Sequence, residues 1–329
     1  MGYYFRSRIS RLNYLRSLII SKQYSDMRYS IVVQFMLLFS FSLQAQRAEM
    51  VHEWLRHSFV PVSPDDSSGF TNAYPEFDGK TVVGFGEATH GTREFRKAFV
   101  QLAKDLVRNK GFNVVLLAEC GFIDTYHLND YVINGREHPL TFNRNQSVID
   151  EDFKAFAVWL KEFNQGKEVR DRVWLVGADV LFRNSIATNA LQLVEEFDVH
   201  LSDYQKRLLE EWAFLGNEYD EAYFASRSLI DLTRPADSIS NIIGDAAKER
   251  KLTFRQQYLL QGIASLSLSI QFNAQRSKSS TPRFGSVYNK RDSAMFRNAM
   301  WIADHRPNAR MVVFGHNGHI EKDFGNTSL

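Results

Sequence analysis

Residues 84–95 read Gly-Phe-Gly-Glu-Ala-Thr-His-Gly-Thr-Arg-Glu-Phe and stand between two segments of regular pattern. The run just before them, Thr81–Val83, is apolar and β-branched, as strands are. After them, apolar side chains recur at helical spacing along a helix predicted over 94–110. The pattern predicts a strand, a glycine turn and a helix, which in α/β proteins place side chains at the carboxyl edge of a parallel sheet.

Three more strands are predicted, and helical patterns separate them. The strands are Asn113–Ala118, Arg172–Ala178 and Arg310–Phe314, and the helices span 123–133, 148–163 and 287–304. Strands that alternate with helices indicate an α/β fold with a mainly parallel sheet flanked by helices. A helical insert over about 187–274 lies between the third and fourth strands, and we expect it to cover the carboxyl edge of the sheet. The polar stretch that follows, 275–286, is predicted to be a loop.

Composition and charge indicate a globular protein that does not bind nucleic acid. The chain has 329 residues, of which 44% are hydrophobic and 24% charged, as in ordinary globular proteins. The formal net charge is +2, but residues 1–45 hold six basic side chains and one acidic one, so residues 46–329 carry a net charge of −3. A nucleic-acid partner is therefore not expected. Cys120 is the only cysteine, which excludes an intramolecular disulfide.

The amino-terminal 45 residues are predicted to lie outside the folded domain. Met27 and Arg28 open a short basic region, an apolar run follows over 31–43, and Ala45 suits signal peptidase. The run is short for a membrane span. We expect residues 1–26 to be an upstream extension, 27–45 a secretory signal peptide, and 46–329 one exported domain, periplasmic or secreted, with no stable membrane span.

Each predicted strand ends in ionisable side chains. The first is followed by Glu87 and His90, the second by Glu119, the third by Asp179, and the fourth by His316 and His319. Because neighbouring parallel strands end at one edge of a sheet, these side chains are expected to converge there. Such a convergence of ionisable groups is typical of an active site.

The first two strand ends supply a base and two carboxylates. His90 is predicted to be a general base, since histidine titrates near neutral pH. Glu87 is predicted to orient His90 or to cap the helix that follows. Glu119 follows an apolar run, where a carboxylate needs a partner. That partner is expected to be His90 or Arg291, either in a catalytic site or in a structural ion pair.

Arg291, His316 and His319 complete the candidate site. Arg291 falls near the apolar stripe of its helix and needs an anion. We expect Glu119 or a developing oxyanion or, in a structural salt bridge, Asp292 or another helix. His316 and His319 share a face if a helical turn begins there, and one of them is expected to donate a proton to a leaving alkoxide. Asp179 fits a turn cap better than a catalytic role.

The sequence was also compared with the motifs of a zinc site, a dinucleotide-binding site and a serine hydrolase. Four of the candidates, His90, Glu119, His316 and His319, also form a ligand set suited to zinc. A dinucleotide site at Gly84-Phe85-Gly86 is rejected, because Glu87 would face the pyrophosphate. The Gly-x-Ser-x-Gly elbow of serine hydrolases is absent from the sequence.

The turn motif over 86–95 resembles the signature of the erythromycin esterase family. More of that pattern follows in order over the range from about 81 to 320: Gly111-Phe112, Glu119, Gly177-Ala178-Asp179, Arg291-Asp292 with Met295, and Gly315-His316-Asn317-Gly318-His319. The resemblance implies an esterase-like hydrolase that opens macrolide lactone rings, and hence antibiotic resistance, by direct attack of water without a cofactor. It also implies a carboxyl-truncated chain, since family members usually continue beyond this last motif.

The expected partner is a small-molecule ester, and the sequence leaves the oligomeric state open. Two other functions stay open at this point. One is a metal-dependent hydrolase of another substrate, and the other is a truncated, non-catalytic remnant or binding protein.

Overall fold

The computed structural model describes residues 75–142, 150–181, 183–215, 221–278 and 286–320, together with Glu49, Met50 and Glu53. The chain divides into two compact units, residues 1–61 and 62–329. The three described residues of the first unit are helical. The predicted signal peptide over 27–45 lies outside the described residues.

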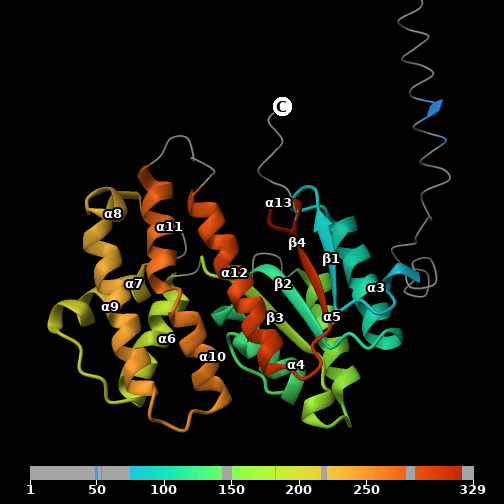
Figure 1. The fold of residues 1–329 in the computed structure, drawn as a ribbon, viewed down its shortest axis with the longest axis horizontal. Helices are drawn as coiled ribbons and strands as arrows, with labels where there is room; N and C mark the ends of the chain where they lie inside the picture. Colours follow the sequence, from blue (N-terminus) through green and yellow to red (C-terminus); the bar gives the residue numbers. More distant parts are fainter. Residues whose placement is uncertain are drawn as a thin grey trace, which may run out of the picture. The chain divides into compact units, whose positions relative to one another are not determined.

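Four strands form one parallel sheet in the part of the chain that the structure describes (Figure 1). They are β1 (Val82–Glu87), β2 (Val114–Gly121), β3 (Trp174–Asp179) and β4 (Met311–His316). The predicted α/β fold with a parallel sheet is confirmed. Each strand continues past its predicted end, so the ionisable residues at the carboxyl edge belong largely to the strands themselves.

The strand order is β1-β4-β2-β3, so β4, the last of the described strands, lies between β1 and β2. β4 pairs with β1 from Val82 opposite Met311 to Glu87 opposite His316. On its other side β4 pairs with β2 as far as Leu117 opposite Phe314. The carboxyl end of β4 is therefore held between the turn that follows β1 and the end of β2.

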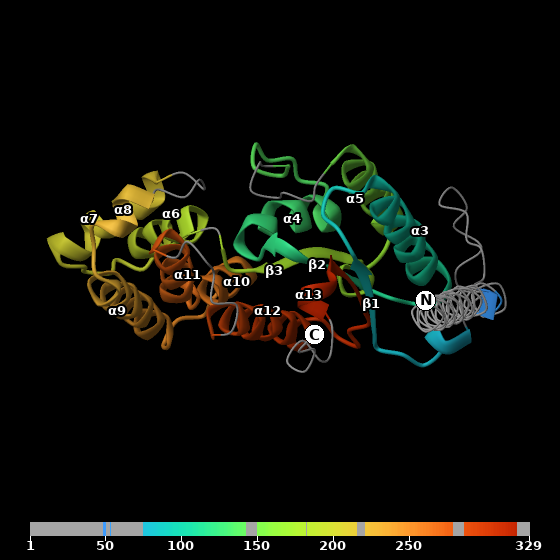
Figure 2. The same ribbon diagram turned by 90° about the horizontal axis from the view of Figure 1, so that it is seen from above.

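Helices cover both faces of the sheet. Figure 2 shows three on one face and α12 (Ser286–His305) on the other. The three are α3 (Arg93–Asn109), α4 (Tyr126–Asn134) and α5 (Glu151–Asn164). Short helical turns complete this part: η1 (Pro75–Phe77), η2 (Ile123–Thr125), η3 (Val169–Asp171) and α13 (Asn317–Ile320).

The strands divide their side chains between two apolar cores. Val115, Leu117 and Phe314 face one core, where they meet Phe99 of α3 and Phe153 of α5. Alternate residues face the second core, which contains Val114, Leu116, Val176 and the apolar sides of the insert helices and α12. A parallel sheet is buried on both faces, which explains why the strands read as continuous apolar runs.

The helical insert lies beside β3 (Figures 1 and 2), and its described residues form six helices. They are α6 (Arg183–Glu196), α7 (Asp203–Phe214), α8 (Glu221–Ala225), α9 (Leu229–Ala247), α10 (Phe254–Ile263) and α11 (Leu266–Lys278). It meets the carboxyl edge at β3, where Ser269 and Asn273 of α11 donate to the carbonyl oxygen of Leu181. The predicted start of the loop, Gln275, is wrong, because α11 continues to Lys278. The apolar residues of α11 pack in the core and stabilise the helix.

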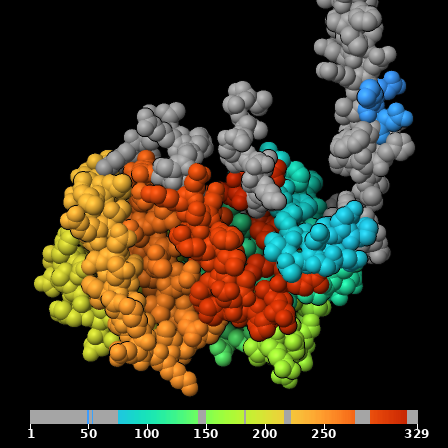
Figure 3. Space-filling model, viewed as in Figure 1, coloured from blue at the N-terminus to red at the C-terminus, as the bar shows by residue number. Residues whose placement is uncertain are grey.

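One helix, α12, carries the candidate Arg291 and its neighbour Asp292, and it is bonded to β3. Part of α12 lies at the surface of the face shown in Figure 3. Phe296 and Met300 of this helix are exposed. On its inner side, the buried Asn298 donates to the carbonyl oxygen of Ala178 at 2.8 Å. None of the described helices combines the length and the apolar character that a membrane span requires.

Strand β2 bulges just where it carries Glu119. Leu117 pairs with Gly177 and Gly121 pairs with Asp179, so three residues of β2 lie opposite one residue of β3. A side chain at Gly177 would place its Cβ 2.2 Å from the carbonyl oxygen of Cys120. Only glycine lets the bulged backbone of β2 come this close.

We predict that Gly177→Ala lowers the free energy of unfolding by roughly 2–4 kcal/mol, because the new methyl group collides with backbone that cannot move away. Gly244→Ala is the matched control. It lies in α9 with open space around it, and alanine there should stabilise the helix by up to about 1 kcal/mol. Urea denaturation of the three proteins measures both values. Equal stability of the two variants would contradict the close approach.

Two imidazole rings, those of His127 on α4 and His138, lie face to face with their centroids 3.6 Å apart. Burial, and then the neighbouring His138, lower the pKa of His127 from 6.5 to about 4. The unfolded chain therefore binds a proton at this histidine more readily than the folded chain does between pH 6.5 and 4. Folding is disfavoured as the pH falls through this range.

We predict that the free energy of unfolding falls by roughly 1–3 kcal/mol between pH 6.5 and 4 because of His127. In His127→Gln this part of the pH dependence should disappear. The same change at the exposed His200 serves as the control. Urea denaturation at a series of pH values measures the difference, and identical pH profiles for wild type and His127→Gln would refute the assignment.

Candidate active site

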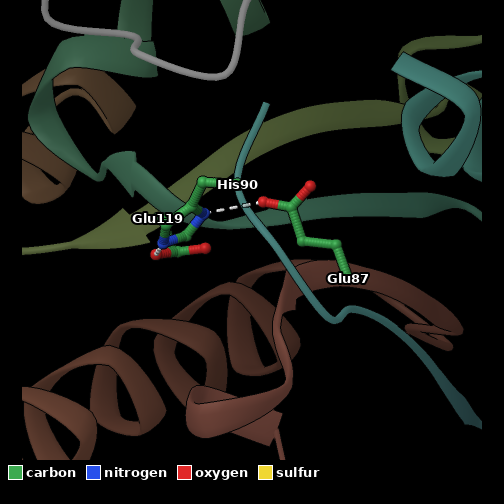
Figure 4. Close-up of side chains that lie close together, drawn as sticks. All are labelled: Glu87, His90 and Glu119. Atoms are coloured by element: carbon green, nitrogen blue, oxygen red, sulfur yellow. Dashed lines mark hydrogen bonds and ion pairs between the residues drawn. The ribbon is translucent and has the colours of Figure 1, made fainter. Parts of the chain in front are cut away.

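His90, in the turn after β1, is hydrogen-bonded to Glu87, the last residue of β1. Gly91 adopts φ +88°, which a residue with a side chain rarely does, and it lets the chain turn into α3. The buried Glu87 accepts a hydrogen bond from His90 Nδ1 at 2.8 Å (Figure 4). Because an ionised carboxylate only accepts, the proton of a neutral His90 lies on Nδ1 and leaves Nε2 as a free acceptor. Of the two roles considered for Glu87, the structure shows the contact with His90.

Glu119 lies on the other side of the His90 ring. Figure 4 shows the imidazole between the two carboxylates, and Glu119 Oε1 is 3.6 Å from His90 Nε2. The second oxygen, Oε2, accepts the backbone N–H of His316 at 2.9 Å. The bulge of β2 thus places Glu119 beside the end of β4. The pairing of β2 with β4 ends at Leu117 and Phe314, and beyond it the carboxylate accepts a hydrogen bond from the backbone of β4.

His319 belongs to the helical turn α13 that begins just after β4. Its Nδ1 is 2.7 Å from Asp292 Oδ1, and its Nε2 is 3.2 Å from Arg291 Nη1. Arginine can only donate, so Nε2 of His319 accepts, and the proton on Nδ1 is donated to Asp292. The same Nε2 lies 3.6 Å from Glu119 Oε1.

His316 has the opposite arrangement. Its Nδ1 lies 3.1 Å from the backbone nitrogen of Gly318, which donates to it. The proton of a neutral His316 is therefore on Nε2, and this edge of the ring is a donor. Its ring centroid is 4.7 Å from that of His90. Although three residues apart in sequence, His316 and His319 thus present different chemistry at Nε2.

Arg291 is bound mainly to Asp179. Its Nε and Nη2 donate to the two carboxylate oxygens at 3.0 and 2.6 Å, in a buried bidentate pair. Burial lowers the pKa of the guanidinium, but the charge and hydrogen bonds of Asp179 outweigh burial and raise the pKa above its ordinary value. The prediction of Glu119 or Asp292 as the protein partner of Arg291 is wrong: the guanidinium pairs with Asp179, because the end of β3 lies against α12.

The sequence reasoning therefore missed two carboxylates. The sequence favours a turn cap for Asp179, which does accept the N–H of Val180, but its larger role is to bind Arg291. The sequence suggests Asp292 only as a partner for Arg291, whereas it binds His319. A signal for Asp179 was available, since it ends a fully buried strand and a buried carboxylate needs a cation.

Exposure indicates where a substrate can approach. The side chain of His90 is 62% exposed, whereas those of Glu87 and His319 are 2% and 13% exposed. The site is therefore open at His90 and closed on the side of Glu87 and His319.

Three of these residues could also hold a metal ion. Ligand atoms of Glu87, His90 and Glu119 lie within 4.8 Å of one another. In addition, Glu87 Oε2 is buried without a hydrogen-bond partner. Nitrogen and oxygen donors of this kind suit zinc and related ions. The group differs from the zinc set considered from the sequence, because Glu87 takes the place of His316 and His319.

Comparisons with known proteins agree with this fold. A crystal structure of a Bacillus cereus protein matches with a TM-score of 0.62 and 21% identity, over 83% of this chain and 66% of that one. An erythromycin esterase, EreC, solved as a mutant in its open conformation, matches with a TM-score of 0.58 and 20% identity, over 77% of this chain and 64% of EreC. The chain thus spans just under two thirds of the length of these solved structures.

Sequence comparison points to the same group. YbfO of Bacillus subtilis (strain 168), which is named as a hydrolase, is 24% identical over 310 residues, or 86% of this chain and 67% of YbfO. A family model described as erythromycin esterase matches residues 107–328, which include Glu119, Arg291 and His319 and follow the turn with Glu87 and His90. The prediction of an esterase-like hydrolase is confirmed at the level of the family: this chain belongs to the erythromycin esterase family.

Proposed function

We propose that this protein hydrolyses an ester, with a macrolide lactone of the erythromycin type as the substrate, by direct attack of a water molecule. One observation carries the proposal: the exposed His90 is held by the buried Glu87 so that its bare Nε2 faces Glu119 Oε1 at 3.6 Å. This is the arrangement that a general base for water requires.

The spacing of His90 and Glu119 suits one water molecule. A distance of 3.6 Å is too long for a direct hydrogen bond. Two acceptors at this separation can instead each receive one hydrogen of the same water. Both hydrogens are then engaged, and a lone pair of the water oxygen is left to attack a carbonyl carbon. His90 Nε2 takes the proton as the new carbon–oxygen bond forms.

The remaining charge can be stabilised and the leaving group protonated by residues already in place. As water attacks, the electron pair of the carbonyl bond moves to its oxygen, and the Nε2–H of His316 is a donor for that oxyanion. The oxyanion then expels the alkoxide, and the proton held on His90 Nε2 passes to it. No covalent enzyme intermediate is formed.

The choice of a macrolide rests on family membership and on the name of EreC. The exposure of His90 also suits a bulky ester, because the reacting bond can reach the base without entering a narrow cavity. A metal-assisted hydrolase is the second candidate, and it is favoured by the grouping of Glu87, His90 and Glu119.

We predict that His90→Gln lowers the rate of erythromycin hydrolysis by about 10²–10⁴-fold, as expected for the loss of a general base. Mass spectrometry detects the product as a gain of one water. His200→Gln, an exposed histidine outside the site, should keep full activity. Equal activity of wild type and His90→Gln would remove His90 from the mechanism. Loss of wild-type activity with a chelator, restored by zinc, would favour the metal-dependent reaction.

We also predict that His316→Ala lowers kcat by about 10²–10³-fold with little change in KM, since an oxyanion donor acts mainly in the transition state. The steady-state kinetics of erythromycin hydrolysis measure both constants. The exposed His305, at the end of α12, supplies the control His305→Ala. A rise in KM alone would show that His316 binds the ground state and does not stabilise the oxyanion.

A further inference from the structure

The site contains two carboxylate–histidine pairs that face each other. In the first, Glu87 holds His90 through Nδ1 at 2.8 Å, and in the second, Asp292 holds His319 through Nδ1 at 2.7 Å. The Nε2 atoms of the two histidines lie at the same distance, 3.6 Å, from one oxygen atom, Oε1 of Glu119. His319 is the more enclosed of the two histidines, since its side chain is 13% exposed and that of His90 is 62% exposed.

The surroundings of His319 determine which ring nitrogen carries the proton. Arg291 Nη1 approaches Nε2 to 3.2 Å and can only donate, while Asp292 approaches Nδ1 and, when ionised, can only accept. Both contacts require the same tautomer, with the proton on Nδ1. Without Asp292 the ring would lose one of the two contacts that set its orientation.

Asp292 itself is held by rigid structure. It lies on α12 next to Arg291, which is bound to Asp179 at the end of β3 by two hydrogen bonds. Six residues further along α12, Asn298 is bonded to the backbone of β3. The carboxylate is therefore offered to His319 from a helix fixed at two points, as a positioning group should be.

We propose that Asp292 is a positioning residue that fixes the tautomer and orientation of His319, and thereby keeps Nε2 of His319 as an acceptor turned toward Glu119 and Arg291. The role in catalysis rests on the proposed ester hydrolysis. The role in orienting His319 is a property of the resting protein and can be measured without any substrate.

Nuclear magnetic resonance of the full chain with ¹⁵N-labelled histidine tests the orientation directly. Long-range proton–nitrogen spectra report which ring nitrogen carries the proton, and His319→Gln identifies the signals of His319. We expect a protonated Nδ1 and a bare Nε2 in the wild type, and a mixture of tautomers in Asp292→Asn. The same single tautomer in Asp292→Asn would overturn the proposal, whatever the substrate of the enzyme is.

Kinetics test the consequence for catalysis. Asp292→Asn should lower kcat for erythromycin by about 10–100-fold with KM nearly unchanged, since His319 would no longer be held beside Glu119, the carboxylate that faces the attacking water. Asp292→Glu should restore much of the rate, and Asp304→Asn, an exposed aspartate on the same helix, should have no effect.

The outcomes separate the two proposals. If the wild type does not hydrolyse erythromycin, the proposed substrate fails and the magnetic resonance result alone decides the role of Asp292. If the tautomer changes in Asp292→Asn but kcat does not, Asp292 orients His319 without any effect on the reaction, and the catalytic part of the proposal is wrong.

Discussion

The carboxylate of Glu119 is the group around which the carboxyl edge of the sheet is arranged. One oxygen accepts the backbone N–H of His316, and the other faces the Nε2 atoms of His90 and His319. A carboxylate placed in a largely enclosed position is costly unless donors surround it. Here the backbone N–H of His316 and the imidazole of His319 come from the end of β4, and the imidazole of His90 comes from the turn after β1. The position of each histidine is thus tied to one carboxylate, whose side chain is 11% exposed.

That position depends in turn on the packing of strands. Glu119 lies in a bulge of β2, which is possible because Gly177 of β3 leaves room for the backbone of Cys120. Since β4 lies between β1 and β2, its end falls between the turn with His90 and the bulge. A different strand order would separate these groups by at least one strand spacing, about 5 Å, and the shared contacts with Glu119 would be lost.

The buried ion pair of Arg291 and Asp179 supports the site, because Arg291 also contacts His319. Because the guanidinium is neutralised by Asp179, its remaining N–H can be directed to His319 without leaving an unpaired charge in the interior. Breaking such a pair generally costs several kcal/mol, whereas forming it adds little stability overall. In this protein the ion pair fixes the position of α12 against β3, so that Asp292 lies within hydrogen-bond distance of His319.

The amino-acid sequence by itself determined the α/β class, the four strands and the candidate residues at the strand ends. It could do so because strand burial, helical periodicity and the glycine turn are local features, and because parallel strands end at one edge. The signal peptide over 27–45 stays a prediction. Only the tertiary structure decided the strand order, the pairing of Arg291 with Asp179 and the role of Asp292. These contacts join residues more than 25 positions apart in the sequence. For Arg291, the sequence offers several carboxylates as partners, among them Glu119, Asp179 and Asp292. The outcome depended on which strands and helices lie side by side, which no local pattern records.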